Sequence, residues 1–479
     1  MTNELPTPAP RARAPRRAPG DLPFSFADVA LAERLASERR EPTWLRAERV
    51  AAATAFASLP VESNQLYTPY LDLRGASLQA ARPYTVTAST PDPGAIAGPI
   101  PEGTAGLIEL AEDRVLACQL SAEAAAAGVV LETFGTALER DPEGFRADLA
   151  DGRTLPTNDK LAMLARGFWA QGVRLVVPDG VRLTAPILVR WRSSNPERAL
   201  ITRTLVRLGA GATAQLVEEQ LPSGPAIACA AGETVPQGFF HGTTEVVLGR
   251  DASLAMASIQ DLPPDQVAFQ HRHASIGAGA SLHWALAQLG GRLVRSRVDN
   301  RLEGDRSSVE QVEIVFAGEE QLFDLTSYTR HLGRDTTGNL LSKGALLDRS
   351  RSYMKGLITI ERSAVGTDSF LGEFGMNLSR AARAVAIPSL EIDQPDCRRA
   401  AHSSSVGPID PSQLFYLESR GIPPDEARKF VVLGFLEPVV ARVPLESARE
   451  SLRTLLDEKW AAGLARAEAA AAAVATPAA

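Results

Sequence analysis

In the middle of the chain, apolar residues recur at every second position rather than with the spacing of a helix. Between residues 173 and 189, two alternating segments are separated by the turn-forming sequence Pro178-Asp179-Gly180. Successive side chains of a strand point to opposite faces, so this pattern predicts a strand, a turn and a second strand. The pattern continues to about residue 392 with almost no helical periodicity between its segments. A mainly β core is therefore expected.

This alternating region is built from a loosely repeated unit: an apolar residue, a turn of Gly or Asp, a small or polar residue, and a new strand. The units begin at Leu208, Leu248, Ile276 and Leu302, about 26 to 40 residues apart. The longest interval contains a Gly- and Pro-rich insertion at 224–238. Strand–turn units at such a period indicate a solenoid in which each rung covers the next. We predict a parallel β-helix over residues 156–400.

The regions on either side of this core have different patterns. Residues 21–155 begin with helical periodicity and become mixed, and residues 401–460 are helical. Residues 1–20 are rich in Pro, Arg and Ala, which predicts a disordered tail. Residues 461–479 are rich in Ala, and we expect them to fray or to be disordered.

Helix signals are strong after residue 409. Asp410 is a good N-cap, Pro411 suits the first helical position, and Gly421 ends the helix. Acidic residues follow Pro424 and open a second helix, where the positive end of the helix dipole favours them. Apolar or small residues then recur on one helical face, at Ala427, Phe430, Val431, Gly434 and Phe435.

The run from His402 to Ile422 reads H-x-x-x-V-G-x-I-D-x-x-Q-L-F-Y-L-x-S-R-G-I. This motif resembles the signature of the SufB/SufD family, the scaffold subunits of the SUF machine for iron–sulfur cluster assembly. Residues 41–60 and 160–189 also resemble family segments, so the likeness extends over about residues 25–445. It implies a right-handed parallel β-helix flanked by helical segments. The motif positions that carry it most clearly are Gln413, Leu414, Phe415, Tyr416, Leu417, Ser419, Arg420 and Gly421.

Composition and charge narrow the classes of function. Hydrophobic residues make up 45% of the chain and the formal net charge is -7, which is typical of a soluble protein and disfavours nucleic-acid binding. No apolar run approaches the roughly 20 residues needed to cross a bilayer. The Arg16-Arg17 pair lacks the apolar segment of an export signal, so we expect a cytoplasmic location and no membrane partner.

The three cysteines, Cys118, Cys229 and Cys397, are far apart and show neither C-x-x-C nor zinc spacing. An iron–sulfur cluster normally needs about four ligands of the thiolate class. We therefore expect this chain to handle a cluster only transiently, or with ligands supplied by a partner.

His402 is the main candidate for contact with iron. Imidazole is a common ligand of iron, and the small residues around His402 would let a cluster or a partner approach closely. From residue chemistry alone, a surface histidine beside a helix cap is the favoured alternative. The resemblance favours a functional role, because the SufD branch carries a required histidine at this motif position, facing its SufB partner.

Cys397 is a second candidate ligand, or alternatively an inert buried cysteine. The family commonly places its cysteine two residues before the histidine, whereas Cys397 lies five positions before His402. Residues an odd number apart in one strand face opposite ways, which weakens the case for a joint site.

His271 and His273 lie two residues apart, on one face of a predicted strand, and His283 follows the next turn. This spacing would suit a metal site. It also suits a polar outer face of the solenoid, which is the interpretation we favour.

The resemblance implies a subunit without catalytic activity. The sequence lacks the nucleotide-binding motif G-x-x-x-x-G-K-[ST], and in the family a separate ABC ATPase, SufC, docks on the C-terminal helices. The expected contact here is the stripe of Phe430, Val431, Gly434 and Phe435, with packing against the β-helix as the alternative role of this stripe.

The chain resembles SufD more than SufB. The neighbours of His402 are Ala401 and Ser403 rather than acidic residues, and residues 353–392 contain no cysteine. The resemblance thus implies a partnership with a SufB-like subunit and a SufC-like ATPase, and iron or a transient cluster shared with SufB. It leaves open FAD binding in the complex, which no sequence feature indicates, and a homodimer when the chain is alone.

Two other hypotheses remain. A SufB-type scaffold would bind the nascent cluster directly. A β-helix polysaccharide-processing enzyme would use paired carboxylates, with Asp299, Glu303 and Asp305 as candidates. The missing export signal and the long C-terminal motif argue against the enzyme.

Overall fold

The computed structural model describes residues 24, 26–85, 100–150, 155–224 and 236–475. The predicted disordered tail at 1–20 and Cys229 lie outside these residues.

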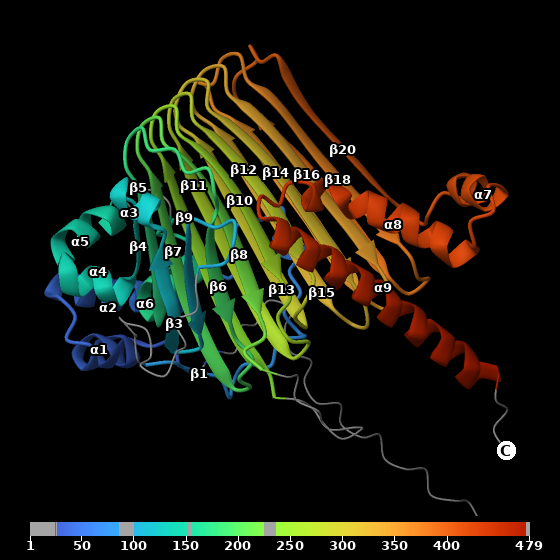
Figure 1. The fold of residues 1–479 in the computed structure, drawn as a ribbon, viewed down its shortest axis with the longest axis horizontal. Helices are drawn as coiled ribbons and strands as arrows, with labels where there is room; N and C mark the ends of the chain where they lie inside the picture. The colour runs from blue at the N-terminus through green and yellow to red at the C-terminus, as the bar shows by residue number, and fades with distance from the viewer. Residues whose placement is uncertain (1–23, 25, 86–99, 151–154, 225–235, 476–479) are drawn as a thin grey trace, which may run out of the picture.

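Two parallel stacks of strands form the body of the molecule (Figure 1). The chain alternates between them, so that odd-numbered strands from β5 onward build one stack and even-numbered strands from β6 onward build the other. Sheet A contains β1 (Arg82–Pro83), β4 (Val130–Thr133), β5 (Gln171–Val177), β7 (Arg198–Leu208), β9 (Gly238–Leu248), β11 (Gln266–Ile276), β13 (Leu293–Leu302), β15 (Leu322–His331), β17 (Arg351–Ile360) and β19 (Arg383–Ile392). Sheet B contains β2 (Gly106–Ala111), β3 (Arg114–Leu120), β6 (Ile187–Arg192), β8 (Thr213–Leu221), β10 (Ser253–Gln260), β12 (Ser281–Gln288), β14 (Ser308–Ala317), β16 (Thr337–Leu346), β18 (Asp368–Asn377) and β20 (Arg399–Gly407).

The register within each sheet is regular. β13, β15 and β17 begin 29 residues apart and pair in parallel without a shift, so residues one turn apart along the chain lie side by side. From β5 and β6 onward every ladder is parallel; β2–β3 and β4–β5 are antiparallel. The predicted parallel β-solenoid is thereby confirmed.

The Gly and Asp turns stack as the repeated unit predicts. Gly211, Asp251 and Gly279 each take a positive φ, of 67°, 56° and 67°. The Gly211 N–H donates to the carbonyl of the next turn, and the Asp251 N–H does the same one turn on. Gly adopts this left-handed conformation freely and Asp tolerates it better than most residues, which explains the residue types at this recurring position.

Helices cover the outer faces of both sheets (Figure 1). An N-terminal group packs on sheet A, burying residues such as Phe239 and Phe269, and a C-terminal group packs on sheet B, burying residues such as Ile259 and Ile314. The N-terminal group is α1 (Val29–Glu38), α2 (Thr43–Ser58), the 3-10 turn η1 (Thr68–Tyr70), α4 (Phe134–Arg140), α5 (Pro142–Ala150) and α6 (Lys160–Phe168). The short helix α3 (Ala122–Ala126) instead packs through Ala124 against the interior core of the solenoid. The C-terminal group is α8 (Pro424–Val440) and α9 (Glu446–Ala475), and it is preceded by α7 (Pro411–Ser419), which has no buried side chain.

Two predicted boundaries differ from the structure. The helical region expected at 401–460 begins only at Pro411, because β20 extends the solenoid through Gly407. The tail expected to fray from residue 461 continues α9 to Ala475, which is consistent with the high helix propensity of alanine. Within the described residues, none of the helices is both long and apolar enough to cross a membrane.

Candidate functional site

The last turn of the solenoid forms an open end. β19 pairs only with β17 and β20 only with β18, so within the described residues each has one unpaired edge. Most residues of β20 are exposed, and the apolar side chains of Ile392 and Val406 are 46% and 41% exposed. Pro388 lies in β19, which fits an edge strand because proline cannot donate to a neighbouring strand. Unpaired edges of this kind are ready to pair with another chain.

His402 lies on β20, within this open end. It is the register partner of Leu371 on β18, which is fully buried inside the solenoid. In-register neighbours of a parallel sheet point to the same face, so His402 belongs to the lumen-facing row of the last strand. Val406, four residues on, contacts the position of its own partner Gly375 from that face. Because no further strand lies over β20 in the described chain, the His402 side chain is exposed.

Glu373 lies one rung behind this exposed row. It is the register partner of Ser404, its side chain is only 1% exposed, and its carboxylate accepts a hydrogen bond from the Ile387 N–H at 2.8 Å. Burial raises the pKa of Glu373 to about 8, against the opposing effects of that hydrogen bond and of Lys355. Glu373 is therefore largely a neutral acid at pH 7. Sequence reasoning missed it, although its place 31 residues before Ser404, one turn along the chain, was the available signal.

Cys397 lies in the turn before β20 rather than in the strand. The alternation of strand faces, which weighed against a joint site with His402, therefore does not apply to this pair. Cys397 is half-buried and packs beside an apolar cluster that includes Ile358 and Leu371, so it belongs to the same end of the solenoid. Cys118 is on β3 at the opposite end, where burial raises the pKa of its thiol to about 11.

The family-like motif forms a projecting helix. In α7 none of the side chains is buried, and Phe415 and Tyr416 are 73% and 57% exposed. The motif also caps its own helix: Gly421 takes a φ of +83°, and the Ser419 hydroxyl donates to the Tyr416 carbonyl. Helix geometry thus accounts for Ser419 and Gly421. The Tyr416 ring lies 5.2 Å from the Arg420 guanidinium, and both aromatic rings stay largely exposed within the described residues.

An apolar groove of about 600 Å³ lies between α7 and α8. It is lined by Met376, Ser412, Gln413, Tyr416, Leu417, Phe430, Val431, Gly434 and Phe435. The stripe predicted on α8 is therefore only partly buried: Ala427 is buried, and Val431 and Phe435 are half-buried against the cluster on sheet B, whereas Phe430 and Gly434 are exposed. The fully buried face of α8 also includes Val432, Leu436 and Val439. Phe430 is 57% exposed, whereas the Phe435 ring is partly covered and lies 4.6 Å from the Lys343 ammonium.

The paired histidines lie on the outer face of sheet A, as expected, but they are not a polar surface. His271 and His273 are 1% and 2% exposed, because the N-terminal region covers this face. His273 lies 3.0 Å from a carboxylate oxygen of Asp299. His283 is on sheet B, is partly exposed, and lies 3.4 Å from Glu310. Among the residues that the structure describes, no group of three or more His, Cys, Asp or Glu side chains could hold a metal ion.

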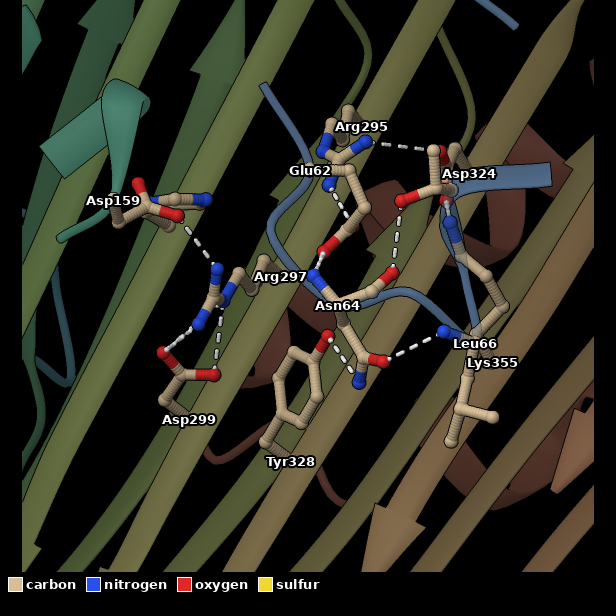
Figure 2. A network of polar contacts seen from close by, with 12 residues as sticks. Glu62, Asn64, Leu66, Asp159, Arg295, Arg297, Asp299, Asp324, Tyr328 and Lys355 are labelled. Carbon is tan, nitrogen blue, oxygen red and sulfur yellow. Dashed lines mark hydrogen bonds and ion pairs between the residues drawn. The ribbon is translucent and has the colours of Figure 1, made fainter. Parts of the chain in front are cut away.

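The carboxylates of the enzyme hypothesis do not form a catalytic pair. Asp299 is held by Arg297 in a covered ionic network (Figure 2). Although burial opposes its ionisation, Arg297 and His273 keep the pKa of Asp299 below its usual range. Glu303 pairs with Arg301, and Asp305 accepts a backbone hydrogen bond in a turn. Each carboxylate has a structural partner, so the structure lends the enzyme hypothesis no support.

A long parallel solenoid with an open end, an exposed histidine at that end and a projecting aromatic helix is the architecture expected of a scaffold-type protein. Comparisons with known proteins agree. A family model described as "SUF system FeS cluster assembly, SufBD core domain" matches residues 190–435, about half of the chain. The chain belongs to this SufBD family of iron–sulfur cluster assembly proteins.

Individual relatives point the same way. Iron-sulfur cluster assembly protein SufD of Bacillus subtilis is 28% identical over 301 residues, 63% of this chain and 67% of the relative. A SufBD family protein of Mycobacterium bovis is 33% identical over 229 residues, which cover 46% of this chain and 58% of the relative. One of Staphylococcus epidermidis is 25% identical over 352 residues, 73% of each chain.

Proposed function

We propose that this chain is a SufD-like, non-catalytic subunit of a cytoplasmic SUF complex, which pairs with a SufB-like subunit and docks a SufC-like ABC ATPase. The observation that carries the proposal is the open solenoid end, where β19 and β20 each have one edge unpaired among the described residues and β20 carries the exposed His402. This is the place where a second solenoid can add without disturbing the fold.

The open end suits a partner with the same architecture. Strands of a second solenoid would pair with the free edges of β19 and β20 and would cover Ile392 and Val406. A SufB-like chain offers such strands, and so does a second copy of this chain. We therefore propose a heterodimer in the complex and a homodimer when the chain is alone.

His402 would contribute to handling the cargo at this junction. An iron–sulfur cluster takes about four ligands, of which His402 supplies one, so the partner must supply others. Cys397 lies at the same end and is the second candidate from this chain. We propose that iron or a transient cluster is bound between the two subunits as cargo rather than as a resident cofactor.

The groove between α7 and α8 is the proposed docking surface for the ATPase. Exposed aromatic side chains such as Tyr416 and Phe430 are the residue types that dominate the energy of protein interfaces. α8 and α9 lie along sheet B, so movement of a bound ATPase would be transmitted to the solenoid through these helices (Figure 1).

Flavin binding gains no support from the structure. The glycine pair Gly209 and Gly211 forms a solenoid turn between β7 and β8, whereas a dinucleotide site needs a helix that begins directly after its glycine loop.

The test uses the tagged chain expressed with SufB-like and SufC-like subunits from the same source. We expect all three to co-purify, and a Val406→Asp variant to lose the SufB-like subunit. A His402→Ala variant should keep the complex and lose cluster assembly, whereas a Ser404→Ala variant on the same strand face should retain both.

Three results would contradict parts of this proposal. Wild-type assembly by the His402→Ala complex would remove the role of His402. Purification of the chain without either partner would remove the SufD-like assignment. Visible cluster absorbance of the lone chain after anaerobic reconstitution would favour the SufB-type scaffold.

A further inference from the structure

A second concave site lies on the outer side of sheet A, where β13, β15 and β17 begin. It has a volume of about 510 Å³ and is closed on one side by residues 72–75 of the N-terminal region. Ligand pockets commonly range from about 300 to 1,000 Å³, so a small organic molecule fits. Four arginines line it, Arg74, Arg292, Arg349 and Arg351, together with the carboxylates of Asp72 and Glu320. We call it the arginine pocket.

The charges of the arginine pocket do not balance. Four guanidinium groups against two carboxylates leave an excess of two positive charges, in a chain whose formal net charge is -7. Such a local excess is opposite in sign to the net charge of the whole chain, and it would attract an anion.

Three of the arginines share the two carboxylates. Glu320 pairs with Arg292 at 2.9 Å and also with Arg349, and Asp72 pairs with Arg74 at 2.6 Å. Hydrogen bonds from Arg74 lower the pKa of Asp72, and hydrogen bonds from Arg292 and Arg349 lower that of Glu320. Both carboxylates therefore stay ionised at neutral pH, and both remain paired with these three arginines.

Arg351 is the fourth arginine of the pocket, and its guanidinium group forms no ion pair with either of these carboxylates. Its backbone is fixed, because it is the first residue of β17 and its N–H donates to the Gln321 carbonyl at 2.9 Å. Its side chain is exposed and, within the described residues, makes no hydrogen bond or ion pair within 4 Å, although its charge helps to lower the pKa of Asp72. A guanidinium offers five N–H donors in a planar fork that matches two oxygens of a phosphate.

The floor of the arginine pocket is apolar. Leu293 is buried and Leu322 is half-buried, and both line the cavity below the arginines. An anion with an organic portion can therefore place its charges on the guanidinium groups and the remainder on the two leucines.

We propose that the arginine pocket binds a small molecule that carries a pyrophosphate or polyphosphate group. Two or more closely spaced negative charges match the excess of two positive charges, and the anchor is Arg351. The shared chemistry is the phosphate chain, whether it comes from inorganic pyrophosphate or from a nucleotide. This site is separate from His402 and does not depend on the function proposed above.

Isothermal titration of the purified full chain at low ionic strength tests this proposal, with pyrophosphate and ADP as separate probes. We expect saturable one-to-one binding of at least one of them. Arg351→Gln should weaken it by about tenfold or more, since charge-assisted hydrogen bonds are lost. Arg383→Gln is the matched control, because Arg383 is the register neighbour of Arg351 on β19 but does not line the pocket.

The titration results distinguish a specific phosphate site from its absence. Binding of pyrophosphate and ADP with equal affinity would assign recognition to the phosphates, and tighter binding of ADP would add a contact of the nucleoside; both support the site. Absence of saturable binding of either probe would overturn it. An equal loss in Arg351→Gln and Arg383→Gln would also overturn it, by showing diffuse attraction. Unchanged circular dichroism and melting temperature establish that both variants are folded.

Discussion

Glu62 connects the N-terminal region to the outer face of sheet A, and its replacement by alanine should release that region. Its carboxylate lies 2.5 Å from Arg295, which also contacts Asp324, and Asp324 contacts Lys355 at 2.6 Å (Figure 2). All four side chains are at most 3% exposed. Two acids and two bases thus balance in a place that excludes water.

Removal of Glu62 leaves two buried cations for one carboxylate. Breaking a buried ion pair in this way costs about 3 to 5 kcal/mol. Burial already lowers the pKa of Lys355, so this lysine can lose its proton and limit the imbalance. We therefore expect about 3 kcal/mol for Glu62→Ala. The double variant Glu62→Ala, Arg295→Met should recover part of this loss, because its remaining charges balance.

Hydrogen exchange measured by mass spectrometry is the suitable assay, since a chain of this length is not expected to unfold in one step. Peptides around residues 60–76 should lose about 3 kcal/mol of protection. Glu38→Ala is the control: its partner Arg34 is 3.9 Å away and both side chains are more than half exposed, so the change should stay within about 0.5 kcal/mol. A loss below about 1 kcal/mol in Glu62→Ala would refute the reasoning.

Three further predictions concern the groove, the buried acid and the turns. Phe430→Ala should abolish co-purification of the ATPase while changing the melting temperature little, because the side chain is 57% exposed; an unchanged complex would exclude Phe430 from the interface. The raised pKa of Glu373, about 8, means that the folded state binds a proton more tightly than the unfolded state. Stability should therefore fall as pH rises from about 4.5 to 8, by at most about 1.4 kcal/mol per pH unit, and the fall should be smaller in Glu373→Gln when unfolding is compared at pH 6 and pH 8. Gly304→Ala should lower the stability of the fold by more than about 3 kcal/mol, because a Cβ there would lie under 3.0 Å from the backbone of Ala278. In Gly211→Ala the new Cβ meets open space, so the variant should lose only about 1 kcal/mol, for its positive φ. Equal melting temperatures of the two variants would contradict this difference.

Local signals were sufficient where neighbouring residues decide the structure. The period-two alternation and the recurring Gly or Asp turns predicted the solenoid, because strand faces and left-handed turns depend on a few adjacent residues. Asp410 caps α7 as expected, since its side chain accepts from the Ser412 N–H at 2.9 Å. Helix ends were predicted less well: α9 continues past residue 461, where the Ala-rich tail was expected to fray.

The sequence by itself determined the fold class, the family-like motif and the choice of His402 as a candidate iron ligand, because each depends on residues that are close together in the chain. Only the tertiary structure decided which candidates are accessible. His271 and His402 both lie on strands, yet His271 is buried beside Asp159, 112 residues earlier in the chain, whereas His402 is exposed because its strand is the last of its sheet. Glu373 and Ser404 become neighbours only when one turn stacks on the next. Burial and adjacency depend on segments that are distant in the chain, so the local periodicity of the sequence does not predict them.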